Sequence, residues 1–167
     1  MGRSVGGESS VQSVRVAVSL QANRENHWFG SMNRGRMADP SVSVRLRGGT
    51  VYVTAAYSPS PGTHIDQEPV LAVRATDAPA VGAAVLTGLR HFTDGGQVPD
   101  WSAYPSPILA AAGVRSWNEL ERGLHSCAVK SAAGCLTILG DAGPKQLPPG
   151  ASAEEIGLAV LSALTSG

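Results

Sequence analysis

Residues 41–56, SVSVRLRGGTVYVTAA, place two alternating segments on either side of a Gly-Gly pair. Glycines suit the positive backbone angles of a two-residue hairpin turn, so Gly48-Gly49 predicts an antiparallel hairpin. This turn sets a register whose first face is entirely apolar: Leu46 with Val51, Val44 with Val53 and Val42 with Ala55. A slip of one residue would move every one of these side chains to the other face. We expect the opposite face to be wetter; it carries Ser43, Arg45, Arg47, Thr50, Tyr52 and Thr54.

Two helical segments further along the chain are nearly alike, VGAAVLTGL at 81–89 and IGLAVLSAL at 156–164. Asp77 is a suitable N-cap for the first helix, and Pro79 is tolerated in its first turn. Ser152, with Glu155 three residues on, forms a capping box that opens the second helix. Gly82 and Gly157 occupy matching positions and would allow close approach.

The segments before these helices are also alike in order. Residues 125–140, HSCAVKSAAGCLTILG, predict a second hairpin that turns near Ala133-Gly134, and a Pro/Gly-rich loop over 141–150 follows. Its apolar face comprises Cys127, Val129, Leu136 and Ile138. Before the first helix we expect a turn-rich loop over 58–69 and a strand over 70–75. The fold is therefore predicted to be α+β: a largely antiparallel sheet of two pseudo-repeated hairpin-loop-helix halves, with both helices on one face.

The remaining segments complete the predicted organisation. Residues 1–12 are Gly/Ser-rich and expected to be disordered, and 13–167 to form a single domain that starts with a strand at 13–20. Two short helices should bridge the halves. Ser106 caps the first, with Pro107 at its start and Gly113 past its end, and Ser116 with Glu119 forms a capping box for the second.

Composition limits the functional classes. Thirteen basic and thirteen acidic side chains balance, so no overall field would attract nucleic acid or an anionic membrane. The halves differ: residues 1–90 hold nine basic and six acidic side chains, whereas 91–167 hold four and seven. No segment has the length of a signal-peptide core or of the roughly 20-residue apolar span that crosses a membrane. We expect a cytoplasmic protein.

No residue set predicts catalysis, a metal or a cofactor. The glycines lack the spacing of a phosphate-binding loop, and the four histidines lack ligand spacing. His125 and Cys127 share a strand face roughly 7 Å apart, beyond hydrogen-bond reach. Cys127 and Cys135 point to opposite faces of the predicted hairpin, so we expect no disulfide. A cysteine hydrolase stays as a third alternative, but the prediction is that the protein is not an enzyme.

Two patches are candidate binding surfaces. Asp94 and Asp100 flank Trp101 and Tyr104, a pattern of acids around aromatic anchors that suits a basic protein partner. An equally good explanation is that Trp101 and Tyr104 pack on the hydrophobic core and anchor the linker between the two halves. Asp66 and Glu68, expected on a solvated loop, are added as candidate contacts.

The loop from Gln21 to Met37 suggests a different partner. It combines Arg24, Arg34 and Arg36 with Trp28 and Phe29, which could stack on bases and hold phosphates. The alternative function is thus a small nucleic-acid- or ligand-binding module that uses the Arg24–Arg36 loop.

The tract YPSPILAAAGVRSWNELERG, from Tyr104, resembles a segment of the immunity proteins of bacterial contact-dependent growth inhibition systems, the CdiI-like family. The family pattern AGVKSW-x-x-L matches 112–117 and Leu120, and its ending, a strand pair followed by LGxAVLxAL, resembles residues 127–164. The resemblance covers roughly the last 65 residues. The matching positions Gly113, Ser116, Trp117, Gly157 and Val160 suggest structural roles.

The resemblance implies a non-enzymatic function. Such a protein binds the C-terminal toxin domain of a large exported effector, commonly a nuclease, and blocks its active site in the cytosol of the producing cell. The implied partner is that cognate toxin domain, with no direct contact to nucleic acid or membrane and no cofactor. The toxin-binding candidates are then Asp94, Asp100, Trp101, Tyr104, Asp66 and Glu68.

Overall fold

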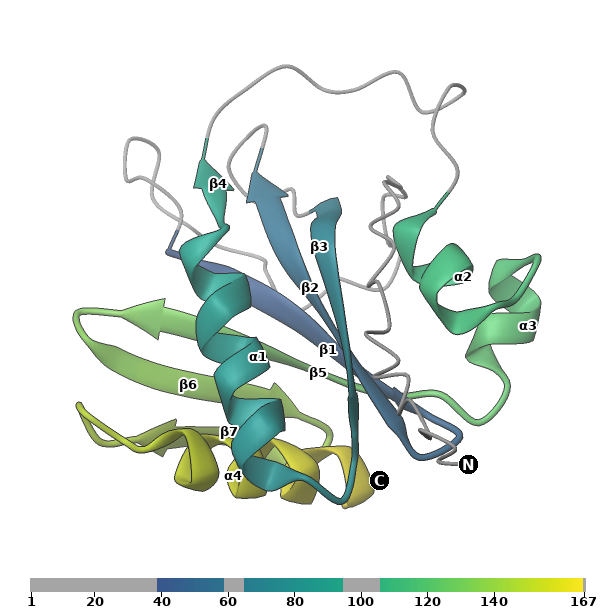
Figure 1. The fold of residues 1–167 in the computed structure, drawn as a ribbon. Helices are drawn as coiled ribbons and strands as arrows, with labels where there is room; N and C mark the ends of the chain where they lie inside the picture. Colours follow the sequence, from purple (N-terminus) through teal and green to yellow (C-terminus); the bar gives the residue numbers. More distant parts are fainter. Residues whose placement is uncertain (1–38, 59–64, 95–105, 167) are drawn as a thin grey trace, which may run out of the picture.

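The structure, a computed structural model, describes residues 39–58, 65–94 and 106–166. Its strands form one sheet in the order β3-β2-β1-β5-β6-β7, and the short β4 runs parallel to β2. Helices α1 and α4 lie side by side on one face of this sheet (Figure 1). The elements in chain order are β1 Ser41–Arg47, β2 Thr50–Ser58, β3 Ile65–Arg74, α1 Ala78–Arg90, β4 Thr93–Asp94, α2 Pro107–Ala112, α3 Trp117–Glu121, β5 His125–Ala132, β6 Cys135–Gly140, β7 Gly143–Leu147 and α4 Ala153–Thr165. The predicted α+β class and the two helices on one face are confirmed.

The first hairpin has the predicted register. Leu46 pairs with Val51, Val44 with Val53 and Val42 with Ala55. The prediction of a wetter opposite face is wrong at one end of the sheet, where Tyr52, Arg45 and Thr54 are buried. Tyr52 belongs to a second apolar cluster, to which Ile108 of α2 and Leu120 of α3 contribute from that side. The sheet thus has an apolar cluster on each face.

Two segments expected to be loops are strands. β7 pairs with β6 inside the supposed loop over 141–150, and β3 begins at Ile65 instead of 70. β7 occupies an edge of the sheet, where Pro144 is tolerated because the outer side of the strand needs no N–H donor. In β3, Glu68 and Pro69 join through a cis peptide and are skipped in the pairing with β2, so the alternation that marks a strand is interrupted there.

The two halves are therefore a closer repeat than the sequence predicts. Each consists of a three-stranded antiparallel meander followed by a helix, namely β1-β2-β3-α1 and β5-β6-β7-α4. Their first strands pair antiparallel at the centre of the sheet, where Val42 faces Val129 and Val44 faces Cys127. This pairing relates the halves by an approximate two-fold rotation and joins both meanders into one sheet (Figure 1).

The helix layer closes the main core. Buried side chains of α1 and α4, including Val81, Val85, Ile156 and Val160, pack on the apolar faces of both hairpins. The predicted caps of both helices are present: Asp77 accepts a hydrogen bond from the Ala80 N–H, and Ser152 and Glu155 form the capping box.

The bridging helices differ from their prediction in detail. Ser106 holds the N-cap position of α2, but its side chain makes no capping hydrogen bond. Ser116 caps α3, whereas the Glu119 carboxylate accepts from the Arg115 N–H and not from Ser116. The expected disordered segment at 1–12 and strand at 13–20 lie outside the described residues. None of the helices in the described ranges is long and apolar enough to cross a membrane.

Candidate interaction surface

The predicted contact residues fall into two groups. Asp100, Trp101 and Tyr104 lie outside the described residues, as does the Arg24–Arg36 loop. Asp94 ends β4, where its backbone pairs with Ser58, and Asp66 and Glu68 belong to β3. Since β4 and β3 both pair with the last residues of β2, the fold brings Asp94 and Asp66 to the same end of the sheet.

Asp66 is engaged inside the protein. Its carboxylate lies 2.5 Å from the Arg45 guanidinium, and the two side chains are 11% and 5% exposed. The Thr54 hydroxyl accepts a hydrogen bond from Arg45 at 3.2 Å and donates one to Asp66 at 3.0 Å. A cation as buried as Arg45 requires such a partner. Asp66 thus neutralises Arg45 within the sheet face, which explains why Arg45 is buried.

Glu68 has a different environment. One of its carboxylate oxygens, Oε1, is buried and has no hydrogen-bond partner within the described part of the chain. It shares this feature with Nε of Arg47 on β1. Burying an unpaired polar atom costs free energy, and this oxygen of Glu68 lacks the pairing that both carboxylate oxygens of Asp66 have.

Cys127 is unsuited to nucleophilic chemistry. Burial, and secondarily the charge of Asp141, raises the pKa of its thiol to about 12. The thiol is therefore protonated at neutral pH, whereas a nucleophilic cysteine reacts as the thiolate. Cys127 and Cys135 are both free, and Cys135 faces Ala132, which places it on the other side of the hairpin as predicted.

Metal chemistry has no visible site in the described part of the chain. No group of three His, Cys, Asp or Glu residues there is arranged to hold a metal ion. The region also contains no Gly-rich phosphate loop among its two-residue hairpin turns, which lie at Gly48-Gly49, Ala133-Gly134 and Asp141-Ala142.

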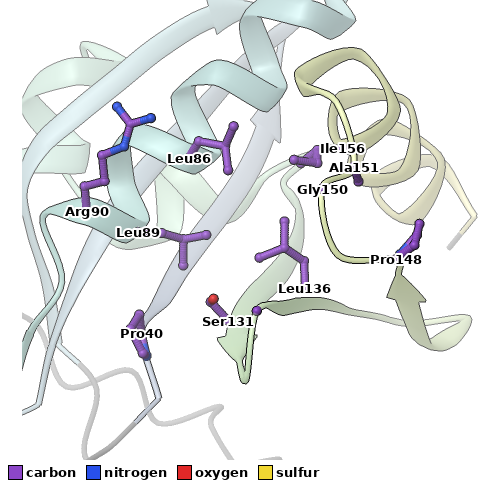
Figure 2. Close-up of a pocket in the computed structure, with 11 residues that line it drawn as sticks. Pro40, Leu86, Leu89, Arg90, Ser131, Leu136, Pro148, Gly150, Ala151 and Ile156 are labelled. Atoms are coloured by element: carbon purple, nitrogen blue, oxygen red, sulfur yellow. The ribbon is translucent and has the colours of Figure 1, made fainter.

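One groove was not predicted. It lies between the last turns of α1, the β5–β6 hairpin and the start of α4, and it encloses about 340 Å³ (Figure 2). We call it the Leu89 groove; its principal lining residues are Leu86, Leu89, Arg90, Ser131, Leu136 and Ile156. In Figure 2 the side chains of Leu86 and Leu89 project from α1 towards the side of Leu136 and Ile156. Apolar grooves with a few polar groups are typical binding sites.

The outward surface of the helix layer is also poor in charge. Between Ala78 and Leu89 in α1, and between Ile156 and Thr165 in α4, there is no charged residue. Leu158 is the large hydrophobic side chain that this layer exposes most, at 56%. The Leu89 groove and this surface together form a region poor in charge, in which Arg90 lines the groove and Glu154 and Glu155 lie in the first turn of α4.

Solved structures with a similar fold include the following two chains. One is a protein of unknown function from Neisseria meningitidis, with a TM-score of 0.58, 19% identity, and coverage of 81% of this chain and 98% of that chain. The other belongs to a CdiA-CT/CdiI toxin and immunity complex from Yersinia pseudotuberculosis, with a TM-score of 0.56, 16% identity, and coverage of 78% and 98%. No protein-family model matches the chain, and no curated protein sequence matches it. At these identities the likeness establishes a shared fold.

Proposed function

We propose that this chain is an immunity protein, which binds a cognate toxin domain and blocks its active site. The single observation that carries the proposal is the likeness to a chain from a toxin and immunity complex, over 98% of that chain and 78% of this one. The sequence resemblance of the last 65 or so residues to the CdiI-like family points the same way and rests on different information.

The structural roles of the family motif support this reading. Gly113 ends α2 with a left-handed backbone at φ 67°, and Ser116 accepts a hydrogen bond from the Glu119 N–H at the start of α3. Trp117 packs against the second apolar cluster, whose members include the fully buried Leu120. The motif thus builds the part of the fold that covers the second sheet face, and the partner-facing residues must be sought elsewhere.

Inhibition by binding fits the chemistry of the described residues. Cys127, the one side chain considered as a nucleophile, is held protonated. A stable one-to-one inhibitor needs an interface of roughly 1,600 Å². The charge-poor outer surface of α1 and α4 with the Leu89 groove provides an apolar centre for such an interface. The acidic candidates Asp94 and Glu68 remain proposed contacts at another part of the surface, and Asp100 remains a proposed contact outside the described residues.

A nuclease is the toxin class that we propose. Nucleases bind phosphates in cationic clefts, and carboxylates docked there would steer association and exclude the substrate. The excess of acidic side chains in residues 91–167 suits that partner. Neutralisation would take place in the cytosol of the producing cell, as the family resemblance implies, with residues 13–167 as the binding domain.

Co-expression tests the proposal directly. The polypeptide encoded immediately upstream is expressed in a bacterial host with and without this chain, and both are tagged for affinity capture. We expect the upstream polypeptide alone to stop growth, and this chain to restore growth and to co-purify with it. A chain carrying a core substitution such as Val85→Asp serves as the unfolded control. Growth arrest that persists despite soluble expression of this chain would refute the proposal.

A further inference from the structure

The Leu89 groove exists because the two halves of the chain differ at one position of their hairpins. Leu46 precedes the turn of the first hairpin and pairs with Val51, and Ser131 holds the same position in the second, where it pairs with Leu136. Both residues lie on the sheet face that carries α1 and α4, since each faces a residue of the main core. A leucine side chain is therefore replaced by a hydroxymethyl group beside Leu136, its cross-strand partner.

Within the described part of the chain, this replacement leaves apolar surface uncovered. In the first half, Leu46 packs against the main core. In the second half, Leu86 and Leu89 of α1 border the hollow above Leu136 and Ile156, and both leucines remain partly exposed. A fold that needed only stability would gain by filling this hollow, because the burial of apolar surface is stabilising. The open groove therefore points to an occupant.

The charge at the groove specifies the chemistry of that occupant. Among the described residues that line it, Arg90 is the one with a charge, and it is exposed at the end of α1. Within the described ranges no carboxylate forms an ion pair with Arg90, in contrast to Arg45. An occupant that combines an apolar side chain with a neighbouring carboxylate would bury its hydrophobic part against the leucines and pair with Arg90.

We propose that the Leu89 groove receives a large apolar side chain of the toxin partner, flanked by an Asp or Glu that pairs with Arg90. This inference rests on the proposed function and adds the place of docking and the chemistry of the docked segment. An anchor of this kind, seated in a preformed groove near the centre of an interface, typically carries a large share of the binding energy.

The substitution Ser131→Leu tests the proposal, because it copies the first half of the chain and fills the groove from within. We expect the variant to have a melting temperature at or above that of the wild type, while its affinity for the purified upstream polypeptide falls at least tenfold. Ser126→Leu is the matched control: Ser126 lies on the same strand, is exposed and pairs with Arg45 on the other sheet face. The control should bind as the wild type does.

Arg90→Glu supplies a second, independent variant. It leaves the groove open and reverses its charge, so we expect affinity to fall at least tenfold and the dependence of binding on salt to weaken. If Ser131→Leu fails to fold, the affinity of Arg90→Glu tests the groove proposal by itself. Circular dichroism and thermal melts establish folding for each protein, and calorimetry measures binding.

The outcomes separate this inference from the proposed function. If the wild type does not bind the upstream polypeptide, the proposed function fails. If the wild type binds and both groove variants bind equally well, the groove inference is overturned while the function stands. Equal weakening by Ser126→Leu also overturns it. So does a wild-type dimer that Ser131→Leu converts to a monomer in light scattering, because the occupant would then be a second copy of this chain.

Discussion

Gly82 and Gly157 hold equivalent positions in α1 and α4, and each lies against the backbone of the residue that begins the other helix. A methyl group on Gly82 would come within 1.7 Å of the Ala153 carbonyl oxygen, and one on Gly157 within 1.8 Å of the Ala78 carbonyl oxygen. The reciprocity follows from the approximate two-fold rotation between the halves. The doubled helix sequence is therefore explained by the contact that each copy makes with the other.

We expect Gly82→Ala to destabilise the protein by about 3 kcal/mol, at the upper end of the usual range for overpacking, because backbone atoms cannot move aside as a flexible side chain can. Chemical denaturation monitored by circular dichroism measures the change. Gly157→Ala should have a similar effect. The double variant should lose less than the sum, because separating the helices once relieves both clashes.

Ala83→Ser on the exposed side of α1 is the control for the glycine variants, and it should change stability by less than about 0.5 kcal/mol. Helix propensity alone favours alanine over glycine by about 1 kcal/mol. If Gly82→Ala or Gly157→Ala were more stable than the wild type, the helices would therefore not touch at these positions.

Asp66→Ala should be strongly destabilising, because it leaves the guanidinium of Arg45 buried without its partner. Removing one member of a buried pair costs about 3–5 kcal/mol, and we expect a loss near the lower figure since Thr54 still accepts a hydrogen bond from Arg45. Equilibrium unfolding in urea provides the measurement. Adding Arg45→Met to Asp66→Ala should recover most of the loss. A small effect of Asp66→Ala would indicate that Arg45 reaches water.

The capping box of α4 predicts a dependence of stability on pH. The Ser152 N–H donates to the Glu155 carboxylate at 2.7 Å, and this bond, followed by that of the Ser152 side chain, lowers the pKa of Glu155 from its ordinary 4.5. The contribution of Glu155 is then fully present above pH 4.5 and is lost as the pH falls through the lowered pKa. The stability difference between wild type and Glu155→Gln should shrink in that acidic range.

A second variant separates the two bonds of this box. Ser152→Ala removes the bond to the Glu155 N–H and should cost about 1 kcal/mol at neutral pH. It keeps the Ser152 backbone donor, so part of the pH dependence should persist. Equal stability curves for wild type and Glu155→Gln from pH 7 down to pH 3 would contradict the proposed linkage.

The two cysteines should react at very different rates. With a pKa of about 12, Cys127 is ionised in only about one molecule in 10⁵ at pH 7, and it is buried, whereas Cys135 is partly exposed. A chromogenic disulfide reagent should therefore label one thiol in the native protein and the second only after unfolding. Cys135→Ser should abolish the fast phase. Rapid labelling of both thiols in that assay would mean that Cys127 is accessible.

The paired hairpins and the capped helices could be predicted because local chemistry determines them. Gly48-Gly49 sets one register, and Ser152 with Glu155 marks the start of a helix; both signals act within a few residues. β7 could not be found this way, because the sequence GPKQL lacks alternation and the strand forms through backbone pairing with β6. The start of β3 was missed because Pro69 interrupts its pattern.

The candidate surfaces depended more on tertiary structure. The sequence predicts a solvated loop at Asp66, yet the register of β2 and β3 brings its carboxylate to Arg45, 21 residues away. The spacing of Gly82 and Gly157 predicts a close approach but not which element approaches. In the structure each glycine contacts the backbone at the start of the other helix. The sequence does contain an indication of the Leu89 groove. When the two hairpins are aligned at their turns, Leu46 of the first corresponds to Ser131 of the second.

Titration of toxin activity against this chain tests the central claim most directly. The purified upstream toxin domain is assayed on a fluorescent nucleic-acid substrate while increasing amounts of this chain are added at concentrations well above the dissociation constant. A protein that neutralises by binding predicts a linear fall to complete inhibition at one equivalent, with full activity regained when the complex is dissociated. Unchanged activity at excess, or lasting inactivation by a small fraction of an equivalent, would contradict the account.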